Sequence, residues 1–229
     1  MHVPDGFLDA PTSIGTAVVA ASGVALALRG ARRELDDRTA PLAGLVALFI
    51  FSTQMLNFPI AAGTSGHLLG GALAAVLVGP CTATLSITVV LLVQATLMAD
   101  GGITALGTNI TLMGLVGVWT GWLVFIALRR VLPKRPLWVV PAAAVAALVS
   151  VPTAALAFSL LFDVGGTVDV PFATVATTMV GIHTLIGIGE AVITALAVLS
   201  IVVVRPDLVH GARPSLERRT LTIREGVSA

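Results

Sequence analysis

The sequence predicts an all-α membrane protein with seven transmembrane helices. Its mean hydropathy is +1.01 and only 11% of its 229 residues are charged, against roughly a quarter in an ordinary soluble domain. The apolar residues gather in seven long runs, most of them close to the about 20 residues that a helix needs to cross a bilayer. These features exclude a soluble globular protein, and we expect a single polytopic domain over residues 1–229.

The seven runs define the expected helices in chain order. They are Ser13–Leu28, Leu42–Ile60, His67–Gly79, Thr82–Ala99, Asn109–Leu128, Leu137–Phe162 and Phe172–Val204. The first run could be read as a signal peptide, but the residues before it include Asp5 and Asp9 and no Lys or Arg. This is the reverse of a signal sequence, so we expect the N-terminus to be retained.

The basic residues predict the orientation of the chain. All 13 Lys and Arg residues fall in three breaks, at residues 29–40, 129–136 and 205–229. Because loops rich in Lys and Arg stay in the cytoplasm, we expect the N-terminus outside and the C-terminus inside, with residues 215–229 as a flexible cytoplasmic tail. No basic tract resembles a nucleic-acid footprint, so nucleic acid is not expected as a partner.

The third run is too short to cross a bilayer by itself. Residues His67–Gly79 make about 18 Å of helix, against a hydrocarbon core of roughly 30 Å. The preceding segment Ala61–Gly66 is rich in glycine and hydroxyl side chains, which suit irregular backbone better than helix. Such backbone is stable at membrane depth only inside the protein or along a polar cavity. We therefore expect this loop to dip inward and to carry His67 below the outer surface.

Polar side chains gather in the predicted outer half of the membrane. They are Gln54, Asn57, Gln94, Asn109 and His183. Five aspartates, at positions 5, 9, 100, 163 and 169, face the same side without a basic residue. Because polar groups within a membrane are costly, they indicate function by default, and the acidic side chains predict an outward-facing site for a cation. The alternative is that the amides only hydrogen-bond neighbouring helices to each other.

Two ionisable residues share one face of the last predicted helix. His183 and Glu190 are seven residues apart, which is close to two helical turns. They could form a proton-linked relay, or they could make a structural polar contact. The remaining histidine of the C-terminal region, His210, is expected to be solvated.

The dipeptide Met1-His2 is a potential metal chelator. Removal of an initiator methionine generally requires a small second residue, so the bulky His2 should leave the α-amine of Met1 in place. That amine, the peptide nitrogen of His2 and its imidazole Nδ1 can close two chelate rings around one ion. A fourth nitrogen from His67 would complete a square-planar set, a geometry that favours Ni(II) or Cu(II) over Zn(II), Mg(II) or Ca(II).

Several motifs together indicate a family. They are Met1-His2-Val3-Pro4-Asp5-Gly6-Phe7-Leu8, Gln54-x-x-Asn57-Phe58-Pro59, Gly63-Thr64-Ser65-Gly66-His67-Leu68-Leu69-Gly70, Asp100-Gly101-Gly102-x-x-Ala105-Leu106-Gly107-x-Asn109 and His183-x-x-Ile186-Gly187-x-Gly189-Glu190. In these motifs the sequence resembles the CbiM/NikM family, the substrate-binding S components of energy-coupling factor (ECF) transporters for cobalt and nickel. The resemblance implies a six-helix core with one added N-terminal helix, in a prokaryotic cell (inner) membrane.

The resemblance also implies a site and partners. It implies Co²⁺ or Ni²⁺ as the bound substrate, held by the Met1 amine, the backbone and imidazole nitrogens of His2, and His67. It implies a supporting role for Gln54, Asn57, Ser65, Gln94 and Asn109. The implied partners are a transmembrane coupling subunit, two ABC ATPase subunits and, in some members, a small accessory membrane protein. The chain has no Gly-x-x-x-x-Gly-Lys-Ser/Thr loop, so ATP hydrolysis is expected on those partners and no catalytic cofactor is expected here.

Two other functions compete with this interpretation. The first is a secondary metal transporter driven by an ion gradient, with His183 and Glu190 as its relay. The second is an intramembrane metalloenzyme. The sequence argues against the second, because it lacks His-Glu-x-x-His and because four nitrogens in a plane leave no in-plane position for an activated water.

Overall fold

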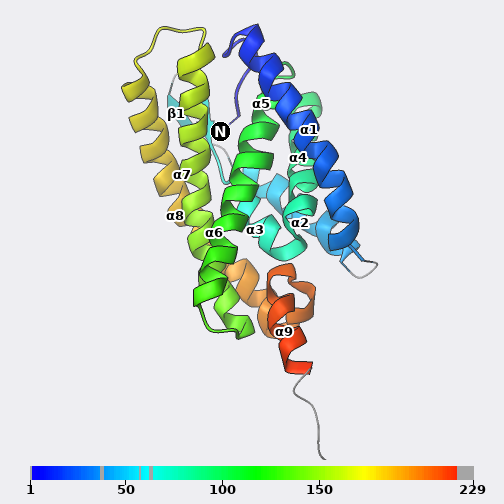
Figure 1. The fold of residues 1–229 in the computed structure, drawn as a ribbon. Coiled ribbons are helices and arrows are strands. Elements are labelled where there is room, and N and C mark those ends of the chain that lie inside the picture. The colour runs from blue at the N-terminus through cyan, green and yellow to red at the C-terminus, as the bar shows by residue number, and fades with distance from the viewer. Residues whose placement is uncertain (1, 37–38, 57, 62–63, 221–229) are drawn as a thin grey trace, which may run out of the picture.

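The computed structural model describes residues 2–36, 39–56, 58–61 and 64–220. Within these residues the chain is a helical bundle with one small β-hairpin (Figure 1). The longer helices are α1 (Ala10–Glu34), α2 (Ala40–Gln54), α4 (Pro80–Leu97), α6 (Val118–Val131), α7 (Val139–Gly165) and α8 (Phe172–Val204). The shorter elements are α3 (Gly71–Val78), α5 (Leu106–Asn109), the π-helix η1 (Ile110–Gly117), the 3-10 turns η2 (Pro136–Trp138), η3 (Pro206–Leu208) and η4 (His210–Ala212), and α9 (Arg213–Thr220).

Five helical segments of the described chain are long and apolar enough to cross a membrane. They are Ala10–Glu34, Pro80–Leu97, Leu106–Val131, Pro136–Gly165 and Phe172–Val204. The other two predicted spans coincide with shorter helices, because α2 has 15 residues and α3 has 8. At the standard rise these make about 22 Å and about 12 Å of helix. The multi-pass helical membrane class is thus confirmed, while seven crossings and their orientation remain predictions.

The surface of the bundle is covered with large apolar side chains. Leu97, Val131 and Val164 are each more than three-quarters exposed, at 76%, 80% and 78%. A monomeric soluble protein rarely leaves apolar side chains in large contiguous patches, whereas lipid tails cover such a surface. The exposed faces of the long helices are therefore the lipid-facing surface.

Helix α3 lies in the centre of the bundle, and all eight of its residues are buried. It packs closely on α6 because small residues meet at the contact. A Cβ atom added to Gly121 would lie 2.7 Å from the Cβ of Ala72, so the two backbones could not approach this closely with a larger residue. The residues that precede α3 are therefore attached to a helix that is tightly packed in the core.

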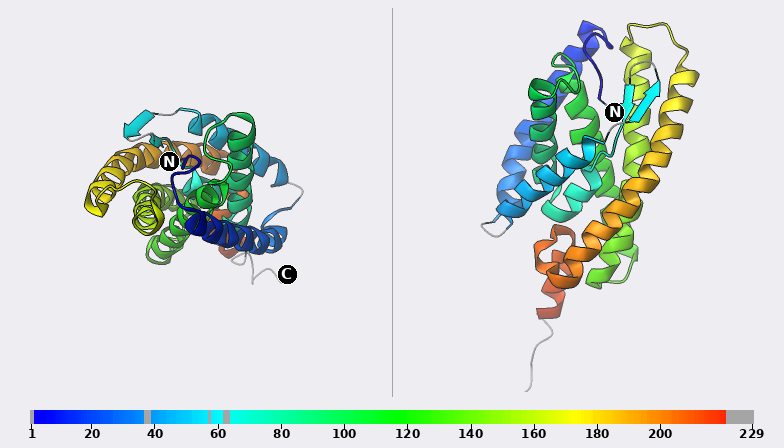
Figure 2. Two further views of the ribbon diagram at one scale, coloured as in Figure 1. Left: turned by 90° about the horizontal axis from the view of Figure 1, so that it is seen from above. Right: turned by 180° about the vertical axis from the view of Figure 1, so that it is seen from behind.

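Two short antiparallel strands take up the described part of the segment expected to be irregular backbone, together with residues 58–60, which were predicted to end the second helix. Strand β1 (Phe58–Ala61) pairs with β2 (Thr64–Gly66), with Phe58 opposite Gly66. The hairpin lies beside α8, towards the end of the bundle where α1 begins (Figure 2). Its second strand leads directly to His67.

Acidic side chains cap two of the helices. At the start of α1, Asp9 Oδ1 accepts a 2.9 Å hydrogen bond from Thr12 N, and the hydrogen bonds from Thr12 hold the pKa of Asp9 below its usual value. At the start of α4, the Glu34 carboxylate accepts hydrogen bonds from Cys81 N at 3.0 Å and Thr82 N at 2.7 Å. Glu34 thereby joins the end of α1 to the beginning of α4.

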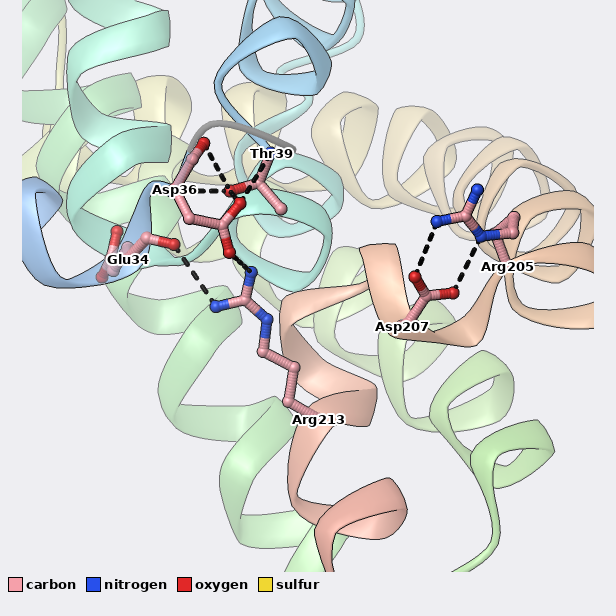
Figure 3. A network of polar contacts seen from close by, with 6 residues as sticks. All are labelled: Glu34, Asp36, Thr39, Arg205, Asp207 and Arg213. Atoms are coloured by element: carbon pink, nitrogen blue, oxygen red, sulfur yellow. Dashed lines mark hydrogen bonds and ion pairs between the residues drawn. The ribbon is translucent and has the colours of Figure 1, made fainter.

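The C-terminal segment is held against the same end of α1 (Figure 3). Arg213 donates to the main-chain oxygen of Glu34 at 3.4 Å and lies 3.6 Å from Asp36 Oδ2, while Arg205 makes two hydrogen bonds to Asp207. Residues 215–220 of the expected flexible tail are helical, as part of α9. The rest of that tail, residues 221–229, lies outside the described residues.

Candidate metal centre

The N-terminal segment, described from His2 onward, lies in the interior of the bundle between α5 and α7 (Figure 1). His2 and Val3 are only 5% and 1% exposed. Asn109, at the end of α5, accepts from Val3 N at 2.8 Å and donates through Nδ2 to Val3 O at 3.1 Å. Gly102 N also donates to Val3 O, at 2.9 Å. Both the N–H and the carbonyl oxygen of Val3 are therefore hydrogen-bonded, to Asn109 and Gly102.

Further contacts hold the residues that follow Val3. Thr104 donates its N–H and its hydroxyl to Asp5 Oδ1, at 2.7 and 2.5 Å, and these hydrogen bonds hold the pKa of Asp5 below its usual value. Leu8 forms an isolated antiparallel bridge with Gly166, in the α7–α8 loop. The N-terminal segment is thus held both by the loop before α5 and by the α7–α8 loop.

The imidazole of His2 lies between two oxygen atoms. Its Nε2 is 3.1 Å from Gln94 Oε1, near the end of α4, and its Nδ1 is 3.0 Å from Asp100 Oδ1, in the loop that follows. Asp100 was expected among the outer acidic residues that attract a cation, but not in contact with a ligand. Its position in the Asp-Gly-Gly motif was the available signal, because glycine allows a chain to approach closely.

His67 stacks on His2 in the interior. The two ring centroids are 4.4 Å apart with an interplanar angle of 24°, and the His67 side chain is 0% exposed. Its Nδ1 lies 2.8 Å from Leu68 O and must carry the proton to donate to a carbonyl oxygen. The lone pair of Nε2 is then free, and this buried atom has no hydrogen-bond partner among the described residues. A neutral imidazole held in this way is a typical ligand for a transition metal.

The backbone that follows His67 is held by two side chains from different helices. Gln54, at the end of α2, donates to Leu69 O at 2.8 Å. The carboxylate of Glu190, in α8, accepts from Leu69 N at 2.6 Å and from Gly70 N at 3.0 Å. Gly70 has φ +76°, and a Cβ there would lie 2.8 Å from Ile50 Cγ1. Only glycine fits this turn without strain.

His183 and Glu190 do not bond to each other. His183 is fully buried, and its Nδ1 lies 2.8 Å from the carbonyl oxygen of Met179, one turn earlier in α8. Glu190 uses both carboxylate oxygens on the backbone before α3. The two residues share a helix, but their hydrogen bonds are separate.

The structure brings together most of the predicted site residues that it describes. His2, His67, Gln94, Asn109 and Gln54 are connected through the N-terminal segment and the loop before α3. The amide side chains of Gln54, Gln94 and Asn109 hydrogen-bond to these two segments. In the alternative interpretation they would instead have joined one helix to another. Met1 and Asn57 lie outside the described residues, and Ser65 is described only as backbone in β2.

The described side chains alone do not make a complete metal site. Among the described residues, no group of three or more His, Cys, Asp or Glu side chains is placed to hold an ion. A metal at the His2 and His67 pair would therefore need further donors, such as backbone or terminal nitrogens. Imidazole ligands suit cobalt, nickel, copper or zinc better than magnesium or calcium.

Lipid-facing helices around a buried histidine pair are the architecture of a membrane protein that handles a metal ion. Residues 2–208 match the family described as the cobalt uptake substrate-specific transmembrane region, CbiM. The chain belongs to this family of cobalt and nickel transport proteins.

Curated relatives and a solved structure agree with this assignment. A putative metal transport protein from Haloquadratum walsbyi is 40% identical, over 91% of this chain and 93% of its own. A cobalt transport protein CbiM from Sorangium cellulosum is 35% identical, over 91% and 94%. A putative fused nickel transport protein NikMN from Archaeoglobus fulgidus is 36% identical, over 92% and 68%. The crystal structure of a truncated transition metal transporter superposes with a TM-score of 0.80 at 28% identity, over 88% of this chain and 98% of the other.

Proposed function

We propose that the chain is the substrate-binding S component of an ECF-type importer, which captures Co²⁺ or Ni²⁺ at its outer face. The observation that carries this proposal is the stacked and buried pair of His2 and His67, with the Nε2 of His67 unpartnered in the described structure. An unpaired buried polar atom is costly, so its presence in a pair of imidazoles points to a ligand. Membership of the family supplies the class of ion.

The proposed ligands are four nitrogens in a plane. They are the Met1 amine, the peptide nitrogen and Nδ1 of His2, and Nε2 of His67. The scarcity of converging side-chain donors in the described residues supports a site completed by the terminus and the backbone. Asp100, 3.0 Å from His2 Nδ1, would supply negative charge beside the bound cation.

Fixed neighbours keep these ligands in place. Gln94 orients the ring of His2, Asn109 holds the backbone of Val3, and Gln54 holds the loop after His67. Residues of this kind typically change metal affinity by about 10- to 100-fold when they are removed. Asn57 and Ser65 are proposed for the same role on the resemblance alone.

Energy for uptake would come from partner subunits. The chain has no phosphate-binding loop for a nucleotide, so we propose a transmembrane coupling subunit, two ABC ATPases and, in some assemblies, a small accessory membrane protein. The site would open to the outside of a prokaryotic cell (inner) membrane, with the basic loops in the cytoplasm.

The test of the ligand set is the free terminus. One residue placed before Met1, or acetylation of the amine, should abolish high-affinity binding of Co²⁺ and Ni²⁺ by the detergent-purified protein, measured by calorimetry. The matched control carries the same residue after Ala229 and should bind normally, and both proteins should melt at the same temperature without metal. Tight binding by the N-terminally extended protein would refute the terminal chelate.

A gradient-driven secondary transporter remains the competing proposal, and uptake into liposomes separates the two. The isolated chain should bind metal without uphill accumulation. Accumulation should require the coupling subunit, the ATPases and ATP, and should not follow an imposed proton gradient. Gradient-driven uptake by the isolated chain that is lost in Glu190→Gln even at saturating metal would instead support a relay through His183 and Glu190.

A further inference from the structure

A cavity lies at the basic end of the bundle, opposite the histidine pair. It has a volume of about 320 Å³ and lies between the last turns of α6 and the C-terminal segment that contains η4 and α9. Figure 1 shows α9 beside the lower end of α6. The metal-site residues do not line this cavity, so it needs a separate explanation.

Three cationic side chains line the cavity, and no acidic residue is among its described lining. They are Arg129, Arg130 and Lys134. Arg129 is already oriented, because it donates to Ser215 Oγ at 2.7 Å and to Pro133 O at 3.0 Å. A guanidinium has five N–H groups, so three remain for a ligand. Since the Ser215 oxygen accepts from Arg129, its own proton is also available to an anion.

The wall formed by the turns of α6 that precede Arg129 is apolar and aromatic. It includes Trp122, Phe125 and Ile126, on the same helix as Arg129 and Arg130. The same helix exposes Leu123 at 57% and Val131 at 80%, so this wall continues into the lipid-facing surface. A free inorganic anion would use the cations but not this wall. An amphiphile with a phosphate would use both.

His210 lines the cavity on the side of the C-terminal segment, as part of η4. We expected this histidine to be solvated, but it is half-buried, and its ring lies 5.6 Å from that of Trp122. Burial lowers the pKa of His210. Its Nδ1 is buried without a hydrogen-bond partner in the described structure.

We propose that this cavity binds the headgroup phosphate of an anionic phospholipid, with the acyl chains along the exposed apolar face of α6. Basic pockets at the cytoplasmic ends of transmembrane helices are suited to such headgroups. An acidic segment of a partner protein is a less suitable occupant, because it would leave the apolar wall without a matching group. The proposal does not depend on the metal site.

The test compares two variants that lose the same charge at the same end of the protein. The first, Arg130→Gln with Lys134→Gln, removes cations that line the cavity. The second, Arg33→Gln with Arg135→Gln, removes exposed cations outside it. Binding of dioleoylphosphatidylglycerol in neutral detergent is followed by tryptophan emission and by native mass spectrometry, with dioleoylphosphatidylcholine as the uncharged comparison.

We expect the cavity variant to bind phosphatidylglycerol roughly 25-fold more weakly, at about fivefold for each charge removed, and the control variant to bind like the wild type. The emission change should vanish in Trp122→Phe and persist in Trp138→Phe. Equal losses in both double variants would overturn the proposal, because they would indicate only a diffuse positive field. Displacement of the lipid by millimolar inorganic phosphate, or a cavity that binds an acidic peptide but no phosphatidylglycerol, would also overturn it.

Discussion

Glu190 accepts a 2.6 Å hydrogen bond from the backbone N–H of Leu69, and so connects the middle of α8 to the loop that carries His67. Its second oxygen accepts from Gly70 N. Unsatisfied backbone groups are costly inside a membrane protein, and here one buried carboxylate satisfies two of them. The geometry therefore favours a positioning role for Glu190 over a role in proton relay.

Replacing Glu190 by Gln should weaken metal binding while the protein still folds. Gln has nearly the same shape as Glu. Its amide NH₂ group, however, would face one of the two backbone N–H groups, Leu69 N or Gly70 N, and could not accept a hydrogen bond from it. We expect a loss of metal affinity of about 10- to 100-fold, measured by calorimetry, with insertion into membranes retained. Ser200→Ala, an exposed change on the same helix, serves as the control. Unchanged affinity in Glu190→Gln would contradict the positioning role.

Asn109→Asp should release the N-terminal segment. The carboxylate keeps an acceptor for Val3 N but loses the Nδ2 donor to Val3 O. We expect faster hydrogen exchange over residues 2–8 and weaker binding of Co²⁺ and Ni²⁺. Thr111→Ala removes a hydrogen bond to Thr16 O in α1 and should leave exchange in residues 2–8 unchanged. If both variants exchange alike, Asn109 has no special part in holding the terminus.

Gly102→Ala should displace the same segment by steric clash. A Cβ at this position would lie 2.4 Å from both Asp5 N and Asp5 Oδ1, so the chain could not keep its present path. We expect metal binding to be lost and limited proteolysis near the N-terminus to increase. Gly44→Ala, where a Cβ meets nothing within 4 Å, should bind normally. Normal binding by Gly102→Ala would show that the terminus docks by another route.

Metal binding should require His67 but not His210. His67→Ala should remove most metal binding, because it takes away a buried nitrogen that has no partner in the described protein. His210→Ala changes a histidine at the opposite end of the bundle and should bind metal like the wild type. Calorimetry with Co²⁺ and Ni²⁺ measures both. Equal affinities in the two variants would leave the loop before α3 without a role in binding.

Much of the architecture followed from hydropathy alone. Lipid replaces water around the bundle, so an apolar run long enough to cross the bilayer becomes a helix whatever its detailed order. Each predicted run overlaps a helix of the structure. The β-hairpin of Phe58–Ala61 and Thr64–Gly66 was not predicted, since two short strands in a glycine-rich segment have no clear alternation of apolar and polar residues.

The sequence by itself determined the membrane class, the family and the identity of the candidate ligands, because these depend on composition and on short motifs around His2 and His67. Only the tertiary structure decided which groups hold those ligands. The contacts of Gln94 with His2, of Asn109 with Val3 and of Glu190 with Leu69 join residues about 90 to 120 positions apart. No local pattern encodes such pairs, because they arise when helices from distant parts of the chain pack around α3. The same packing brought Asp100 to His2 and gave Glu190 two backbone donors in place of a bond to His183.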